Sequence, residues 1–87
     1  MQSAAAQFVR AGREALEAGD WLAARGHYQD AVDAGETAEA LHGLAHALFL
    51  TLDYPAAIEH YERAYAAYRA ECDSRAAVHV ARSLAFA

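Results

Sequence analysis

The residues whose types and spacing best suit chemistry are Glu39, His42 and His46. The two histidines are four positions apart and Glu39 precedes His42 by three, so a helix would place all three on one face. Two imidazoles and a carboxylate in that arrangement can bind a divalent metal. The same spacing also suits ordinary surface residues. We therefore expect no bound metal or cofactor, and keep a metal or small-ligand sensor as an alternative.

Catalysis has less support in the sequence. Cys72 and His79 are a formal nucleophile–base pair, but seven positions and an expected helix break separate them. The chain has no lysine, no glycine-rich phosphate loop and no GxSxG motif, and its serines lie near expected helix ends. We predict that this chain is not an enzyme.

Composition narrows the class of partner and the compartment. The 87 residues carry a net charge of −5, which argues against direct contact with nucleic acid. One cysteine and no signal peptide favour a reducing, cytoplasmic setting. No apolar run approaches the ~20 residues of a membrane span. The expected partner is a protein or peptide.

The elements that would position these side chains follow from an internal repeat. Residues 19–31 recur as residues 52–64, 33 positions further on, with an aspartate, two alanines, a histidine, a tyrosine and a final alanine unchanged. A period of this length is typical of stacked supersecondary units. With one proline and no alternating strand pattern, the chain is predicted to be all-α.

Five helices are expected. They cover about 3–18, 21–34, 38–51, a segment that begins after Asp53, and 74–87. Gly19 would end the first helix, and Asp20, Thr37 and Asp53 would cap the next three. Leu52 stands in the second turn where Gly19 stands in the first.

Two details of the first hairpin are also predicted. Arg10 with Glu14, and Arg13 with Glu17, have the spacing of ion pairs along one helix. Gly26 costs ~1 kcal/mol inside a helix; a closely approaching backbone is one explanation, and the sequence leaves the question open. The packing stripe of the second helix is expected to include Trp21, Ala24, Tyr28, Ala31 and Val32.

The repeated pattern resembles the tetratricopeptide (TPR) repeat. The matching positions are Gly19, Asp20, Trp21, Ala24, Tyr28 and Ala31 in one copy, and Asp53, Tyr54, Ala57, Tyr61 and Ala64 in the other. The resemblance implies a right-handed α-α superhelix of antiparallel hairpins, in one domain over 1–87. It would hold about two and a half repeats: 3–35, 37–71 and an unpaired last helix over 74–87. In such hairpins Gly12, Ala24, Ala45 and Ala57 stay small, while Tyr28 and Tyr61 fill the gaps.

A narrower resemblance concerns the residues after the second copy. The run from Glu62 to Arg69, followed by Cys72 to Ala77, is similar to helical repeats of large bacterial LuxR-type transcriptional regulators. It implies that this chain is a fragment or arm of a larger regulatory protein, with the DNA-binding part elsewhere. The alternative under this resemblance is a sensor domain that binds a small ligand or metal. Translating the downstream reading frame would test the first, and a zinc-induced thermal shift that is lost in His42→Ala would test the second.

The TPR resemblance also implies where a partner would bind. First helices of successive repeats line a concave groove, so the expected groove residues are Val9, Arg13, Leu16, Glu39, His42, His46, Phe49, Val78 and Arg82. Arginine, histidine and aromatic side chains together suit an acidic or amphipathic peptide. The alternative is that these are ordinary solvated positions.

The last expected helix has an apolar face without a cover. That face comprises Ala77, Val80, Ala81 and Leu84. Repeat arrays usually end in polar capping helices. We therefore expect either a homodimer through this helix or cover from the remainder of a longer protein.

Overall fold

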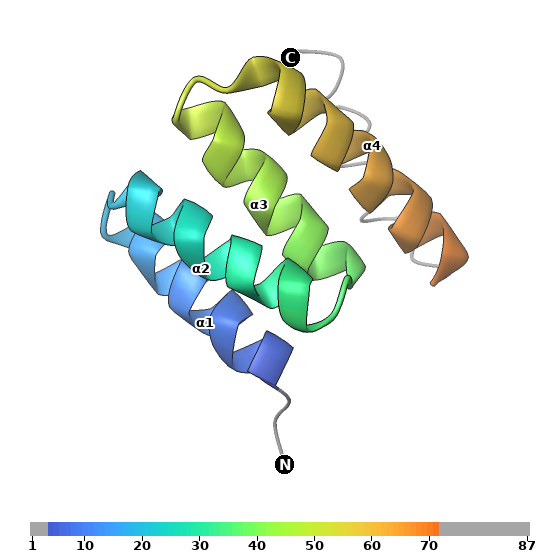
Figure 1. The fold of residues 1–87 in the computed structure, drawn as a ribbon, viewed down its shortest axis with the longest axis horizontal. Coiled ribbons are helices and arrows are strands. Elements are labelled where there is room, and N and C mark those ends of the chain that lie inside the picture. Colours follow the sequence, from blue (N-terminus) through green and yellow to red (C-terminus); the bar gives the residue numbers. More distant parts are fainter. Residues whose placement is uncertain (1–3, 72–87) are drawn as a thin grey trace.

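The computed structural model describes residues 4–71 as four α-helices (Figure 1). They are α1 (Ala4–Glu17), α2 (Trp21–Ala34), α3 (Ala38–Leu50) and α4 (Tyr54–Ala70). The all-α prediction is confirmed, and α2 has the predicted bounds. The expected fifth helix over 74–87 lies outside the described residues.

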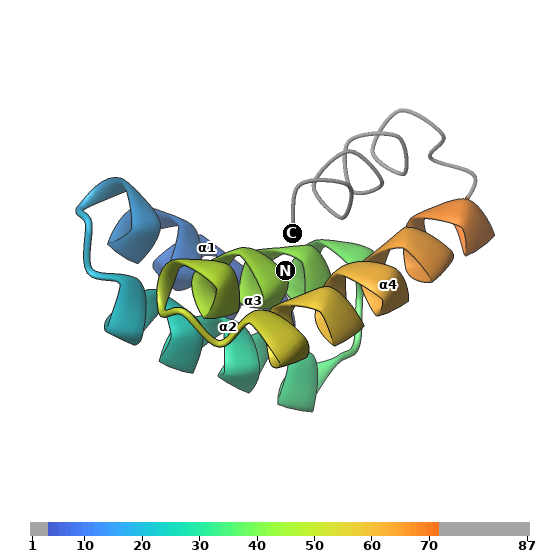
Figure 2. The same ribbon diagram turned by 90° about the horizontal axis from the view of Figure 1, so that it is seen from above.

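The helices form two antiparallel pairs that lie side by side. α1 pairs with α2, α3 pairs with α4, and α3 also packs on α2 and α1. Figure 2, turned by 90°, separates α1 from α2, which partly overlap in Figure 1. One core therefore runs within and between the pairs and takes buried residues from all four helices.

Both hairpin turns have the same hydrogen-bonding pattern. Gly19 N–H donates to the Leu16 carbonyl at 3.0 Å and Asp20 N–H to the Ala15 carbonyl at 2.9 Å. Leu52 and Asp53 donate to the corresponding carbonyls 33 positions later, also at 3.0 and 2.9 Å. This is the Schellman motif, which places its first residue beyond the helix in the left-handed region. Accordingly, φ is 79° at Gly19 and 67° at Leu52.

Equivalent positions of the two repeats are buried alike. Ala24 and Ala57 are fully buried, and Tyr28 and Tyr61 are each 5 % exposed. Small residues let the helix backbones approach, and the two tyrosines fill the space beside them. The predicted hairpin packing is confirmed over the described residues.

The ring of Tyr28 lies between two glycines of different helices. A Cβ atom on Gly12 of α1 would lie 2.7 Å from the ring, and one on Gly43 of α3 would overlap the opposite edge. Tyr28 thus joins α1, α2 and α3. The requirement for Gly12 was predicted, whereas that for Gly43 was not.

At three positions of the helices and turns the structure differs from what the sequence suggested. Trp21 is 45 % exposed rather than packed. Gly26 has no close neighbour, since a Cβ there would meet nothing within 4 Å. Asp53 is the N-cap residue of α4 by position, but its side chain makes no capping hydrogen bond. Its carboxylate lies instead 3.9 Å from the Arg25 guanidinium, whereas Asp20 and Thr37 cap their helices as predicted.

Candidate functional site

A hollow of about 790 Å³ opens between α1 and the end of α4. Its lining comes from residues 5–13 of α1, residues 37–42 at the start of α3, and Tyr68 and Glu71. The size falls in the range of ligand and peptide sites. Three of the four helices therefore meet at one surface depression.

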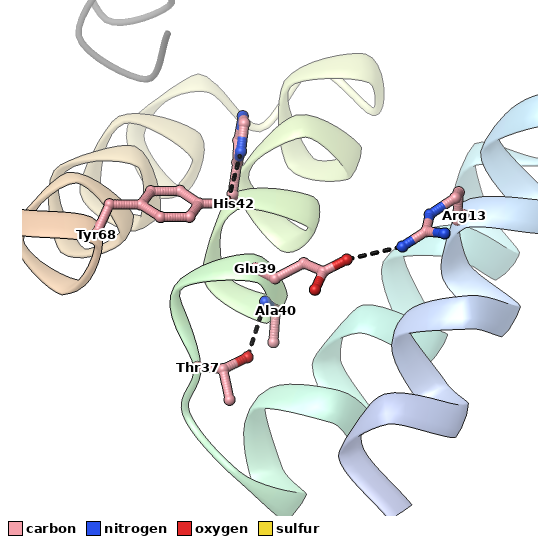
Figure 3. Close-up of polar contacts among 6 residues, drawn as sticks. All are labelled: Arg13, Thr37, Glu39, Ala40, His42 and Tyr68. Carbon is pink, nitrogen blue, oxygen red and sulfur yellow. Dashed lines mark hydrogen bonds and ion pairs between the residues drawn. The ribbon is translucent and has the colours of Figure 1, made fainter. Parts of the chain in front are cut away.

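Arg13 and Glu39 form an ion pair across this hollow. The Arg13 Nη2 atom lies 2.7 Å from Glu39 Oε1, so the pair connects α1 with α3 (Figure 3). The predicted partner within the helix, Glu17, is therefore not the one observed. Both side chains are more than half exposed, and such a pair stabilises the fold by ~1 kcal/mol at most. A competing carboxylate could replace Glu39 at little cost to the fold.

Arg10 places a second guanidinium on the same wall, one helical turn from Arg13. It lines the hollow, is exposed, and makes no ion pair with any described residue. The predicted pair with Glu14 is not formed. The α1 wall is therefore cationic, whereas Glu39 and Glu71 lie on the opposite walls.

His42 is held in place by two aromatic residues of α4. Its Nδ1 atom lies 3.3 Å from the Tyr68 hydroxyl, and its ring meets the Tyr68 ring edge-on at 5.9 Å (Figure 3). The Tyr61 ring lies 6.0 Å away on a tilted plane. Which group donates the hydrogen bond depends on the histidine tautomer. The imidazole is thus oriented at the border of the hollow rather than free to rotate.

A smaller hollow of about 160 Å³ continues along α3 and α1. Leu16 and His46 line it together with Tyr28, and Glu39 and His42 border both hollows. Burial raises the pKa of Tyr28; the nearby Arg13 guanidinium lowers it, and the carboxylates of Glu39 and Glu17 raise it. Tyr28 therefore presents a neutral ring to this hollow.

The structure unites most of the predicted groove residues that it describes. Val9, Arg13, Glu39 and His42 line the larger hollow, and Leu16 and His46 line the smaller one. Phe49 lines neither, because its ring packs against Tyr54 at a centroid distance of 5.3 Å.

Several sequence expectations fall outside the described residues. They are the groove positions Val78 and Arg82, the Cys72–His79 pair, and the dimer face of Ala77, Val80, Ala81 and Leu84.

Between residues 4 and 71 the structure contains no cluster of ligands for the metal site that the sequence left as an alternative. No three histidine, cysteine or acidic side chains gather there in a metal-binding arrangement. Glu39 faces Arg13 and His42 faces Tyr68 instead.

The lining residues of the larger hollow that sequence reasoning missed include two charged ones and one aromatic one: Arg10, Glu71 and Tyr68. Arg10 precedes Arg13 by three positions, so it shares that face of α1. Tyr68 follows Tyr61 by seven positions and therefore continues the stripe of α4 that faces α3. Both could have been found from helical spacing, whereas Glu71 lies just beyond the end of α4.

No protein-family model, curated protein or solved structure matches the chain. Among helices α1 to α4, none has the length and apolar character needed to cross a membrane.

Proposed function

We propose that the chain is a TPR-like protein-interaction module without catalytic activity. Its larger hollow would bind a peptide that carries a carboxylate. The observation that supports this most is the α1 wall, where Arg10 has no ion pair among the described residues and Arg13 has only an exposed one. His42 and Tyr68 would contact the peptide from the opposite side through their rings. A guanidinium suits a carboxylate because it can donate two parallel hydrogen bonds.

The wider arrangement is also a proposal. Two hairpins with matching turns would form the first two repeats of a right-handed superhelix, and residues 74–87 would add a fifth helix. The resemblance to LuxR-type regulators supports the idea of a cytoplasmic arm in a larger bacterial protein. A sensor domain for a small ligand is the second candidate, and the volume of the larger hollow, about 790 Å³, favours it.

Peptide selection tests the proposed function. A random peptide library is selected on the full chain, and the affinities of enriched peptides are measured by fluorescence anisotropy. We expect the enriched peptides to contain Asp or Glu, or to bind only when their C-terminal carboxylate is free. Arg10→Glu and Arg13→Glu should each weaken binding by about tenfold or more, because each removes a charge-assisted hydrogen bond.

Two variants separate lost binding from damage to the fold. Arg25→Glu is the matched control, since Arg25 lies on α2 and does not line the hollow. The double variant Arg13→Glu with Glu39→Arg keeps opposite charges on α1 and α3 but reverses their places. It should be as stable as the original chain and yet bind the peptide as weakly as Arg13→Glu does. Peptides that bind both single arginine variants as tightly as the original chain would refute the proposed site.

A further inference from the structure

The two hairpin turns, between α1 and α2 and between α3 and α4, lie at the same end of the molecule (Figure 1). Among the described residues the large hydrophobic side chains that stand exposed are Trp21, Leu22, Leu52 and Tyr54, between 43 % and 73 %. Residues 19–22 and 50–52 line one open hollow of about 390 Å³ between the turns. We call Trp21, Leu22 and Leu52, with the hollow between them, the turn patch. It involves none of the residues that line the two hollows of the candidate site.

Leu52 is an unfavourable residue for the fold at its position. Its φ of 67° lies in the left-handed region, which costs a residue with a side chain ~1–2 kcal/mol, while Gly19 occupies the equivalent place at 79° without that cost. The side chain is 70 % exposed, so little buried area compensates. Strained residues of this kind gather at functional sites. The leucine side chain is therefore explained better by a contact outside the chain than by the fold.

The charges beside the turn patch are mostly negative. Asp20 lines its hollow, Asp53 follows Leu52 directly, and Glu17 ends the helix that leads into the first turn. A nearby cation, the Arg25 guanidinium, lies 3.9 Å from the Asp53 carboxylate. The patch thus combines an apolar centre with an excess of carboxylates at its rim.

We propose that the turn patch is a second docking surface, for an amphipathic protein segment with leucine-like side chains flanked by lysine or arginine. The apolar side chains would enter the hollow between the turns, and the basic ones would face Asp20 and Asp53. A second copy of the same patch would bring like charges together, which disfavours a self-interaction through it. The acidic rim likewise disfavours an anionic membrane surface. This surface does not depend on the proposed peptide site.

Trp21 allows a direct test, because it is the only tryptophan of the chain and lies within the patch. The full chain is titrated with a Leu/Lys peptide that is amphipathic as a helix, and Trp21 emission and acrylamide quenching are followed. Docking should shift the emission to shorter wavelength and reduce quenching. A Leu/Glu peptide of the same pattern should bind at least about tenfold more weakly than the Leu/Lys peptide, because its charges are repelled by the acidic rim.

The matched variant is Leu52→Gly, which removes the side chain while relieving the backbone. We expect the Leu/Lys peptide to bind this variant about fivefold to tenfold more weakly, because one aliphatic contact is lost. The variant itself should be at least as stable as the original chain. Arg13→Glu, in the other hollow, should leave this titration unchanged.

Three results would overturn the proposal. The first is unchanged affinity in Leu52→Gly, and the second is equal binding of the two peptides. The third is a Trp21 already shielded from acrylamide in the isolated chain, because a second copy or another part of the chain would then cover the patch.

Discussion

Leu52 and Gly19 perform the same backbone task with different residues. Both follow a helix in the left-handed region, and both donate the same pair of hydrogen bonds. No heavy atom lies within 4 Å of a Cβ built on Gly19, so packing does not decide which residue is better there. The comparison therefore isolates backbone conformation.

We expect Leu52→Gly to raise the free energy of unfolding by about 0.5–1 kcal/mol. The gain is smaller than the strain relieved because glycine also makes the unfolded chain more flexible. Urea unfolding, followed by circular dichroism, measures this change in the free energy of unfolding. The reciprocal change Gly19→Leu should cost about 1 kcal/mol or more. A lower urea midpoint for Leu52→Gly would show that the exposed leucine stabilises the turn.

Gly43 and Gly26 are both helical glycines but have opposite surroundings. A Cβ on Gly43 would overlap the Tyr28 ring, whereas one on Gly26 would meet nothing. Gly43→Ala should therefore destabilise the chain by about 1–3 kcal/mol through overpacking. Gly26→Ala should stabilise it by about 0.5–1 kcal/mol, since alanine loses less backbone entropy in a helix.

Urea unfolding of both alanine variants checks this pair. Adding Tyr28→Leu to Gly43→Ala should cost less than the sum of the two single changes, because a smaller side chain leaves room for the new methyl group. Equal effects of the two alanine substitutions would contradict the packing of Tyr28 between Gly12 and Gly43.

At the scale of the helices, much of the architecture was predictable from the sequence. The apolar spacing and the capping residues Asp20 and Thr37 indicated where α2 and α3 begin. The 33-residue echo predicted that α2 and α4 pack in equivalent ways. These signals are local, so one sequence suffices to read them. That Asp53 turns toward Arg25 depends on where α2 lies relative to α4, which local sequence does not specify.

The site was less predictable because its contacts join helices. Arg13 has a carboxylate at helical spacing in Glu17 but pairs with Glu39, 26 positions away. Gly43 matters only because the Tyr28 ring reaches α3. Groove positions carried over by repeat spacing lie on α1 and α3, which both contribute to the two hollows. They did not reveal which charges would meet.

The N-terminus of α3 should depend on its cap more than that of α4. Thr37 Oγ1 accepts a hydrogen bond from Ala40 N–H at 3.2 Å, whereas the Asp53 side chain caps nothing. We expect Thr37→Ala to cost about 1 kcal/mol, the usual value of a cap. Asp53→Ala should lower the free energy of unfolding by only a few tenths of a kcal/mol, the contribution of an exposed ion pair. Thermal unfolding compares the two, and an equal loss would mean that Asp53 caps α4 in solution.

Across the whole molecule, the described ion pairs join elements that are distant in sequence. Arg13–Glu39 links α1 to α3, Arg25–Asp53 links α2 to the start of α4, and Arg63–Glu36 links α4 to the segment before α3. All of these side chains are 39 % exposed or more, so the pairs contribute little to stability. The buried apolar core, in which leucines of α3 pack with the two tyrosines and the alanines, holds the hairpins together instead.

The packing of the two tyrosines predicts how the whole domain responds to alkaline pH. Burial raises the pKa of both Tyr28 and Tyr61 above the ordinary value of 10.0, because a phenolate is poorly solvated inside the protein. Above that value the unfolded chain loses these protons before the folded chain does. The free energy of unfolding is thus fully retained below about pH 10 and falls as pH rises through the folded pKa values.

The chain is well suited to this measurement because it contains no lysine, so tyrosine dominates its titration in the alkaline range. Urea unfolding at a series of pH values from neutral to above 10 should show the decline, at up to ~1.4 kcal/mol per pH unit for each proton involved. Tyr28→Phe with Tyr61→Phe keeps both rings and removes both hydroxyls, so its stability should change much less with pH. Tyr54→Phe, at an exposed position, is the matched control and should leave the decline unchanged. An equally steep decline in the double variant would mean that the two buried rings do not govern the alkaline stability of the domain.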